Sequence, residues 1–229
     1  MSEIWNTVWK NRRVTSDYSL QYYNFINSFS KRLEKNGKVL EAGCGSGDTL
    51  KCFKNQKSFG LDLSTKSLEL AKGNANNLVL ADLFKMPFKD GSFDLVYNSG
   101  VLEHFLEEKT IEGVKEMARV TKQGGYVIII MPNTLCIWFR IYKYLTIKIT
   151  GKWEFGYEES YSIIRLKRII KKSKLKVIKK FGLQVLLPLA TNRFEILPLK
   201  FRKYLIYLDK LFLFREYYAF GIGVICKKK

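Results

Sequence analysis

Three glycines, Gly43, Gly45 and Gly47, alternate with other residues directly after a short apolar run that carries one acid, Glu41. A glycine-rich turn between a strand and a helix lets the backbone approach a ligand closely, and such turns often hold nucleotides. The dinucleotide fingerprint needs a glycine or alanine at the position that Asp48 occupies here, and a carboxylate would repel a pyrophosphate. A phosphate-cradling loop is also excluded, because no Gly-Lys-Ser/Thr follows the turn.

A ligand that has no phosphates and carries a positive charge suits this turn better. S-adenosylmethionine has a sulfonium and an amino group, and the carboxylate of Glu41 suits such a cation. We therefore expect S-adenosylmethionine beside Glu41 and against the backbone of Gly43, Cys44, Gly45 and Gly47. Judged on the glycines alone, a tight turn in an ordinary α/β protein is the competing interpretation.

The elements around the turn predict an α/β fold. Apolar residues at helical spacing cover the first 36 residues, and strands are expected at 38–42, 58–63, 77–82, 93–99 and 124–132, with helices between most of them. Alternation of apolar strands with helices indicates a mostly parallel sheet covered on both faces, which binds ligands at the carboxyl ends of its strands. A helix, a strand, a second helix and a last strand are expected after residue 160, which gives seven strands in total.

Two acids follow the second and third predicted strands. Asp62 can accept hydrogen bonds from both hydroxyls of a ribose, and Asp82 can accept one from an adenine amino group while the backbone N–H of Leu83 meets a ring nitrogen. Structural roles are the alternatives, with Asp62 capping the helix near Ser64 and Asp82 forming a turn.

Four segments in order resemble the motifs of class I S-adenosylmethionine-dependent methyltransferases. They are "VLEAGCGSG", "FGLDLS", "LVLADLFKMPFKDGSFDLVYNSGVLEHF" and "KQGGYVIIIMPN", and they most resemble the small-molecule-type subgroup with "LEH" after the fourth strand. The resemblance covers residues 38–133. It implies a Rossmann-like fold, methyl transfer from S-adenosylmethionine with S-adenosylhomocysteine as product, and a donor site that also includes Leu63, Asn98 and Ser99.

His104 is the one histidine of the chain and follows Glu103 beside the expected methyl group. Histidine suits proton removal near neutral pH, so His104 is the candidate catalytic residue, and Glu103 is a weaker one. Similar enzymes carry a histidine here as a wall of the cofactor pocket, and we favour that role. Methyl transfer needs little from side chains beyond alignment and exclusion of water.

The chain of 229 residues is expected to form one methyltransferase domain. We divide it into an N-terminal helical lid (1–36), a cofactor-binding core (37–132), an aromatic and basic insertion or lid (133–160) and the C-terminal part of the sheet with basic helices (161–229). Four scattered cysteines and one histidine argue against a zinc site. The first residues lack the apolar core of a signal peptide, so a cytoplasmic location is expected.

Charge divides the chain into two parts. Residues 1–131 hold 18 basic and 15 acidic side chains, whereas residues 132–229 hold 22 and 6. Bulky apolar residues lie among the basic ones at 200–214, which favours peripheral contact with an anionic membrane over binding of RNA. A solvated basic surface without a partner is the third interpretation.

The acceptor is expected to be a small molecule, a glycan precursor or a lipid-like compound. The Asn-Pro-Pro-Tyr type motif and the Pro-Cys nucleophile of nucleic-acid enzymes are both missing from the sequence. An RNA-directed methyltransferase and a non-catalytic module that binds S-adenosylmethionine remain alternatives, and the sequence leaves the oligomeric state open.

Overall fold

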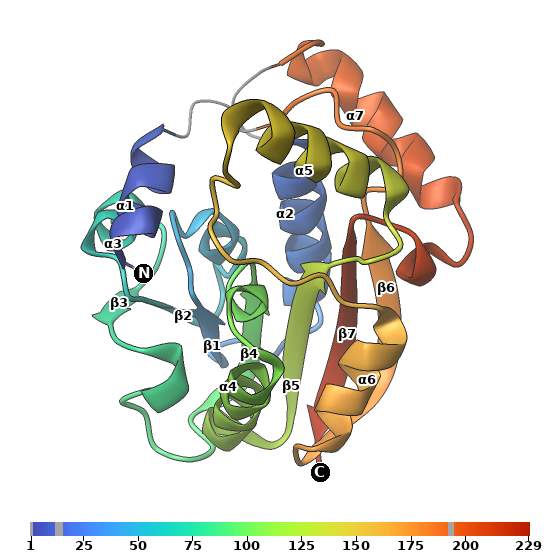
Figure 1. The fold of residues 1–229 in the computed structure, drawn as a ribbon. Coiled ribbons are helices and arrows are strands. Elements are labelled where there is room, and N and C mark those ends of the chain that lie inside the picture. The colour runs from blue at the N-terminus through green and yellow to red at the C-terminus, as the bar shows by residue number, and fades with distance from the viewer. Residues whose placement is uncertain (1, 12–15, 192–194) are drawn as a thin grey trace.

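A seven-stranded sheet forms the centre of the protein (Figure 1). The computed structural model describes residues 2–11, 16–191 and 195–229. The strands are β1 (Lys38–Ala42), β2 (Lys57–Asp62), β3 (Asn77–Leu80), β4 (Phe93–Ser99), β5 (Thr121–Pro132), β6 (Leu175–Leu183) and β7 (Gly221–Lys228).

Seven α-helices and five short 3₁₀ helices are described around the sheet. The α-helices are α1 (Ser2–Asn11), α2 (Asp17–Ser30), α3 (Thr65–Ala71), α4 (Glu107–Val120), α5 (Ile137–Thr150), α6 (Ile163–Lys171) and α7 (Leu199–Leu208). The 3₁₀ helices are η1 (Asp48–Cys52), η2 (Leu83–Lys85), η3 (Leu102–His104), η4 (Asp209–Leu211) and η5 (Arg215–Tyr217). Within the described residues, no helix combines the length and the apolar character needed to cross a membrane.

The strand order is β3-β2-β1-β4-β5-β7-β6. The first five strands pair in parallel, and β7 runs antiparallel to both of its neighbours. The prediction of a mostly parallel seven-stranded sheet is confirmed. Since β1 and β4 are neighbours although β2 and β3 lie between them in sequence, the order reverses at β1, where such sheets bind ligands.

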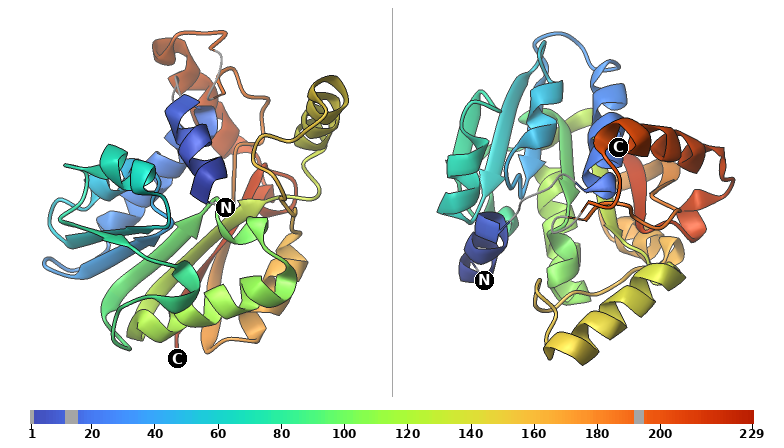
Figure 2. Two further views of the ribbon diagram at one scale, coloured as in Figure 1. Left: turned by 60° about the vertical axis from the view of Figure 1, so that its left-hand side comes forward. Right: turned by 90° about the horizontal axis from the view of Figure 1, so that it is seen from above.

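Helices cover both faces of the sheet, as the apolar strands predict (Figure 2). On one face, Leu40 and Val96 pack in a core with residues of α4 and α6. On the other face, Val39 and Leu95 pack with residues of α2, η1 and α3. Neighbouring strand residues therefore point to opposite cores, which is the alternation that a pleated sheet imposes.

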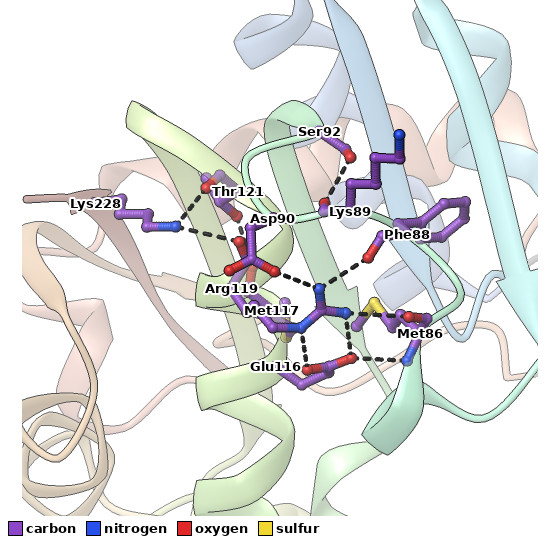
Figure 3. A network of polar contacts seen from close by, with 10 residues as sticks. All are labelled: Met86, Phe88, Lys89, Asp90, Ser92, Glu116, Met117, Arg119, Thr121 and Lys228. Carbon is purple, nitrogen blue, oxygen red and sulfur yellow. Dashed lines mark hydrogen bonds and ion pairs between the residues drawn. The ribbon is translucent and has the colours of Figure 1, made fainter.

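An arginine of α4 holds the loop that carries Asp82 and Leu83 (Figure 3). The Arg119 guanidinium donates to the carbonyl oxygens of Met86 and Phe88, at 3.1 and 2.8 Å, and pairs with Asp90 and Glu116. Glu116 also accepts a hydrogen bond from the Met86 amide. Because one guanidinium satisfies two loop carbonyls, the residues after β3 are kept in a single position relative to α4.

A buried ion pair joins α2 to the C-terminal part of the chain. Asp17 accepts from Arg202 of α7 at 2.7 Å and from the backbone amides of Leu189 and Ala190 at 2.7 and 3.0 Å. The Arg202 side chain is 3% exposed, so this pair fixes the segment before α7 against α2.

Two local expectations need correction. The helix expected after the glycine turn is only the five-residue η1, which ends four residues before β2 and packs with α2 in the second core. The segment 133–160 contains the 14-residue α5, which its mixed aromatic and basic composition did not indicate.

The carboxylate of Glu41 joins three elements at the ligand end of the sheet. It lies in β1, is 5% exposed, and accepts hydrogen bonds from Tyr22 of α2, Thr49 of η1 and Tyr97 of β4, at 3.1, 2.7 and 3.2 Å. Burial raises the pKa of Glu41 to about 8, with the three hydroxyls acting in the opposite direction.

This raised pKa predicts that the unliganded protein loses stability as the pH rises. The pKa of this carboxyl is higher in the folded state than in the unfolded state, so its protonated form stabilises the fold. This stabilisation is complete at pH values below the unfolded-state pKa, and it is lost as the pH rises through about 8. Between the unfolded-state and folded-state pKa values, Glu41 should lower the free energy of unfolding by up to about 1.4 kcal/mol per pH unit, and the Glu41→Gln variant should lack this dependence. Urea unfolding of both proteins from acidic to mildly alkaline pH measures this slope, and parallel curves would contradict the assignment.

Candidate functional site

One cavity of about 540 Å³ opens at the carboxyl ends of the parallel strands. Its lining comes from α1 and α2, the glycine turn, the residues after β2, β3 and β4, the start of α5, the segments 153–158 and 184–191, and Phe220 and Gly221. The volume falls in the range of sites for small ligands and cofactors. The turn and the residues after β2 and β3 form the end that we call the donor end, and the aromatic residues of α5 and 153–155 form the opposite, aromatic end.

The glycine turn requires its glycines. Gly43, Gly45 and Gly47 all have positive φ, between 52° and 79°. A Cβ at Gly43 would lie 2.2 Å from a methyl carbon of Val101, and one at Gly45 would lie 2.1 Å from the Trp9 ring. The turn therefore packs directly under α1 on one side and against the residues after β4 on the other.

Cys44 lines the cavity between these glycines and is buried. Burial raises the pKa of its thiol above the usual range, so the thiol stays protonated and unreactive at neutral pH. Gly47 does not line the cavity, and its amide instead donates to the carbonyl oxygen of Cys44.

Asp62 connects the second strand to the glycine turn. One oxygen accepts from the Gly45 amide at 2.8 Å and the other accepts from the Ser64 amide at 2.9 Å. Burial raises the pKa of Asp62, with these backbone amides opposing the shift. A carboxylate has about four acceptor positions, so Asp62 keeps capacity for the hydroxyls of a bound ribose. The cap of α3 is Ser64 and not Asp62.

The residues after β3 line the neighbouring wall. Asp82 is exposed, and its carboxylate accepts from the Phe84 amide at 2.9 Å as the cap of η2, which is the turn role that the sequence left open. Leu83 is buried beside it, and Leu63 is 45% exposed after β2. All three residues line the donor end.

Of the two polar residues that end β4, one lines the cavity. Ser99 does so, and its hydroxyl lies 2.8 Å from the hydroxyl of Tyr18. Asn98 is fully buried outside the lining and donates through Nδ2 to the carbonyl oxygen of Ala42. Asn98 therefore joins β4 to β1 beside Gly43 and, unlike Ser99, does not face the cavity.

His104 lies in η3 and is 8% exposed on the cavity wall. Its Nδ1 is 2.7 Å from the carbonyl oxygen of Tyr157, and since a carbonyl only accepts, Nδ1 carries the proton. Burial lowers the pKa of His104, so the ring is neutral at pH 7 with a lone pair on Nε2. The ring of Trp5 meets it edge-on at a centroid distance of 4.9 Å.

Glu103 is buried on the same wall. Its Oε2 has no hydrogen-bond partner among the described residues. Burial raises the pKa of Glu103 to about 8, against the effect of the backbone amides of Glu103 and Val101. A buried carboxyl at the cavity wall with spare acceptor capacity is a candidate binding group for a ligand.

Several lining residues were not anticipated from the sequence. Tyr22 entered only as an apolar position of a helix and Tyr18 was not singled out, although their hydroxyls contact Glu41 and Ser99. Trp153 lines the cavity from the segment after α5, where the carbonyl of Tyr157 contacts His104, and no local pattern pairs these two residues. For Trp153, a signal was present in the sequence, because aromatic residues lie close to acids within the predicted insertion.

The sequence of the central part matches a known family. Residues 40–129 match the family model described as a methyltransferase domain. The chain is 29% identical over 115 residues to the Bos taurus protein named "Probable tRNA methyltransferase 9B", and the match covers 50% of this chain and 25% of that protein. The chain thus spans about a quarter of the length of the first curated relatives it matches.

Solved structures share the fold over almost the whole chain. A SAM-dependent methyltransferase from Thermotoga maritima aligns with a TM-score of 0.64 at 21% identity, covering 90% of this chain and 89% of that one. Magnesium protoporphyrin IX methyltransferase from Synechocystis PCC 6803, solved with bound SAH, aligns with a TM-score of 0.62 at 14% identity, covering 93% and 85%. Residues 40–129 therefore carry the sequence pattern of a methyltransferase domain, and the chain shares the fold of solved S-adenosylmethionine-dependent methyltransferases.

Proposed function

We propose that the protein transfers a methyl group from S-adenosylmethionine to a small-molecule, glycan-precursor or lipid-like acceptor held at the aromatic end of the cavity. The observation that carries this proposal is the continuity of the cavity, which joins the donor end to a wall formed by Phe139, Trp153 and Phe155. An apolar wall with few polar groups is typical of sites for small organic ligands.

The residues at the donor end fit S-adenosylmethionine. Gly43 and Gly45 place backbone without side chains on the cavity wall, Asp62 has acceptor capacity for ribose hydroxyls, and Glu41 provides a carboxyl directly before the turn. When bound, S-adenosylmethionine supplies a methyl group that its sulfonium has already activated. The contribution of the chain is to align the acceptor, to exclude water with α1 and the aromatic end, and to receive any proton.

Binding of RNA is the second candidate. It is favoured by the match to a protein named as a tRNA methyltransferase and by the net charge of +19. An assay of methyl transfer from labelled donor to lipid, glycan-precursor, quinone and RNA acceptors compares the two candidates. Incorporation into RNA alone would replace the small-molecule proposal. Donor binding without transfer to any class would favour the non-catalytic alternative.

We also propose that the protein contacts anionic membranes through α5 and α7. Both helices stand above the carboxyl ends of the strands in Figures 1 and 2. Along α5, Ile137, Ile141, Leu145 and Ile149 repeat every four residues and are 46–81% exposed. The segment 199–214 exposes nine further large apolar side chains among the residues whose side chains are described, and its one acid, Asp209, is buried.

Exposed basic residues accompany these apolar side chains. They are Arg140, Lys148 and Lys152 near α5, and Lys200, Lys203 and Lys210 near α7. A surface that combines apolar side chains with lysines suits the boundary of an anionic bilayer. The basic residues Lys171, Lys172 and Lys174 lie at the end of α6 and directly before β6, at the opposite end of the strands from α5 and α7.

The first prediction concerns donor binding. Asp62→Ala should weaken the affinity for S-adenosylhomocysteine by about 1–3 kcal/mol, because ribose hydroxyls and the Gly45 amide lose their acceptor. Asp62→Asn should weaken it less, since an amide oxygen can still accept from Gly45. Isothermal titration calorimetry measures both, with Glu69→Gln on exposed α3 as control. Binding of NAD without binding of S-adenosylhomocysteine would overturn the cofactor assignment.

The second prediction concerns His104, which we propose as a positioning residue. His104→Ala should weaken donor affinity, because the ring supports Trp5 of α1 and holds the Tyr157 carbonyl, and it should leave turnover at saturating donor within about 10-fold. Calorimetry gives the affinity, and kinetics with an acceptor from the screen give the turnover. A loss of about 10²–10⁴-fold in turnover at unchanged donor affinity would identify a general base instead.

The third prediction concerns the membrane surface. The protein should sediment with liposomes that contain phosphatidylglycerol. The bound fraction should fall as salt is added, because charges are screened beyond about 8 Å at physiological ionic strength. Part of the binding should remain at high salt, because the apolar contacts persist. Glutamate substitution of Lys148, Lys200 and Lys203 should weaken binding strongly. The same substitution of Lys171, Lys172 and Lys174 provides a control with identical net charge.

Three results would count against membrane contact. An equal loss of liposome binding in both triple variants would indicate a general charge effect. Failure to bind any liposome would indicate that the basic surface is only solvated and has no membrane partner. Binding to RNA that disappears almost completely with salt, without liposome binding, would favour the second candidate.

A further inference from the structure

The cavity has a charge opposite to that of the protein as a whole. Its described lining includes seven carboxylates and neither lysine nor arginine, although the chain has 40 basic residues. The carboxylates are Glu41, Asp48, Asp62, Asp82, Glu103, Glu154 and Glu158. Four belong to the donor end, which leaves Glu103, Glu154 and Glu158 near the aromatic end. Burial leaves Glu41 and Glu103 protonated at neutral pH, and the other five acids favour cations and disfavour phosphates and carboxylates.

Glu103 and Glu158 differ in how their charges are compensated. Glu158 is paired with Lys143 at 3.0 Å and accepts from the Trp153 indole nitrogen at 3.2 Å. Glu103 is 5% exposed, and its Oε2 has no partner in the described part of the chain. A buried polar atom left without a partner is destabilising, and a ligand that donates a hydrogen bond to it would remove this penalty.

Aromatic rings continue the wall on which these two acids lie. The rings of Trp153 and Phe155 have centroids 5.4 Å apart, and those of Phe155 and Trp5 are 6.3 Å apart. A cation is attracted to the faces of such rings, and an ammonium group between rings and a carboxylate is held by both.

We propose that the methyl acceptor is an amine, bound in its ammonium form by the carboxylate of Glu103 at the aromatic end of the cavity. This inference rests on the proposed methyl transfer and names its substrate class. Glu103 then acts twice, because it recognises the cation and receives the proton that the amine must lose before it can attack.

The step balances in atoms and charge. The ammonium transfers a proton to the Glu103 carboxylate, and the nitrogen lone pair so freed attacks the methyl carbon of S-adenosylmethionine. The N–C bond forms as the S–C bond breaks, the electron pair of that bond stays on sulfur, and the products are an N-methylammonium and the neutral thioether. Water and an additional oxidant take no part.

The surroundings of Glu103 suit this exchange. Burial raises its pKa to about 8, so the carboxyl is protonated in the empty site at pH 7, and a bound ammonium favours its ionised form. The raised pKa also lies closer to that of an alkylamine than the pKa of an exposed carboxyl would, which eases the return of the proton. The negative Glu158 raises it further, whereas Lys143 and the backbone amides of Glu103 and Val101 lower it. Tyr18 and His104 also line this part of the cavity, and both are neutral at pH 7.

The experiment measures binding to the protein saturated with S-adenosylhomocysteine. The probes are two matched sets that differ in one group: phenethylamine, phenethyl alcohol and phenylacetate, and tryptamine, tryptophol and indoleacetate. Calorimetry should give the amine of at least one set an affinity about 10-fold or more above its alcohol, with the carboxylate weakest. Glu103→Gln should reduce this preference to about 3-fold or less, and Glu108→Gln, on the exposed side of α4, should preserve it.

Three outcomes would overturn the inference. They are alcohols that bind as tightly as amines, a preference unchanged in Glu103→Gln, and no amine binding in either set. Thermal unfolding and S-adenosylhomocysteine affinity of Glu103→Gln, expected to match the parent protein, show that the variant is folded. If the parent protein fails to bind S-adenosylhomocysteine, the proposed function itself fails, whereas normal binding without an amine preference removes only the substrate class.

Discussion

The buried carboxylate of Glu41 is the contact on which the ligand end of the sheet depends. It lies at the point where the strand order reverses, and it accepts hydrogen bonds from α2, η1 and β4. A carboxyl so deeply buried is tolerated because three hydroxyls satisfy it and because its raised pKa lets it remain protonated. The glycine turn directly after it is therefore held between elements that are distant in sequence, and the position of the cavity follows from that.

A second constraint is the separation of charge between cavity and surface. Seven of the 21 acids line the cavity, whereas its described lining includes no lysine or arginine, and most of the basic residues lie in 132–229. The basic surface on α5 and α7 can meet an anionic partner, and the acidic interior selects against anionic groups from the same partner. An amine presented at a lipid surface would satisfy both conditions, which connects the proposed membrane contact to the proposed substrate class.

The sequence predicted the fold because the strands are short, apolar and separated by helices at regular intervals. It also predicted which residues follow the strands, and Glu41, Gly43, Cys44, Asp62 and Ser99 do line the cavity. Asn98 shows the limit of this reasoning, because consecutive strand residues point to opposite faces and only one of the pair at the end of β4 can face the ligand.

What the sequence could not predict depends on long-range contacts. His104 is held by a carbonyl 53 residues away, and Tyr18 meets Ser99 across 81 residues. The helix α5 was missed for a different reason. Its apolar stripe is exposed and not buried, so its repeat of four residues does not match the expectation that apolar residues mark a core.

A crystal structure of the protein with S-adenosylhomocysteine tests most directly whether one cavity holds donor and acceptor in line. We expect ribose hydroxyls within hydrogen-bond distance of Asp62, the adenine beside Asp82 and Leu83, and the sulfur facing Glu103 and the aromatic end. A product bound outside this cavity, or bound with its sulfur directed away from Glu103, would contradict this expectation.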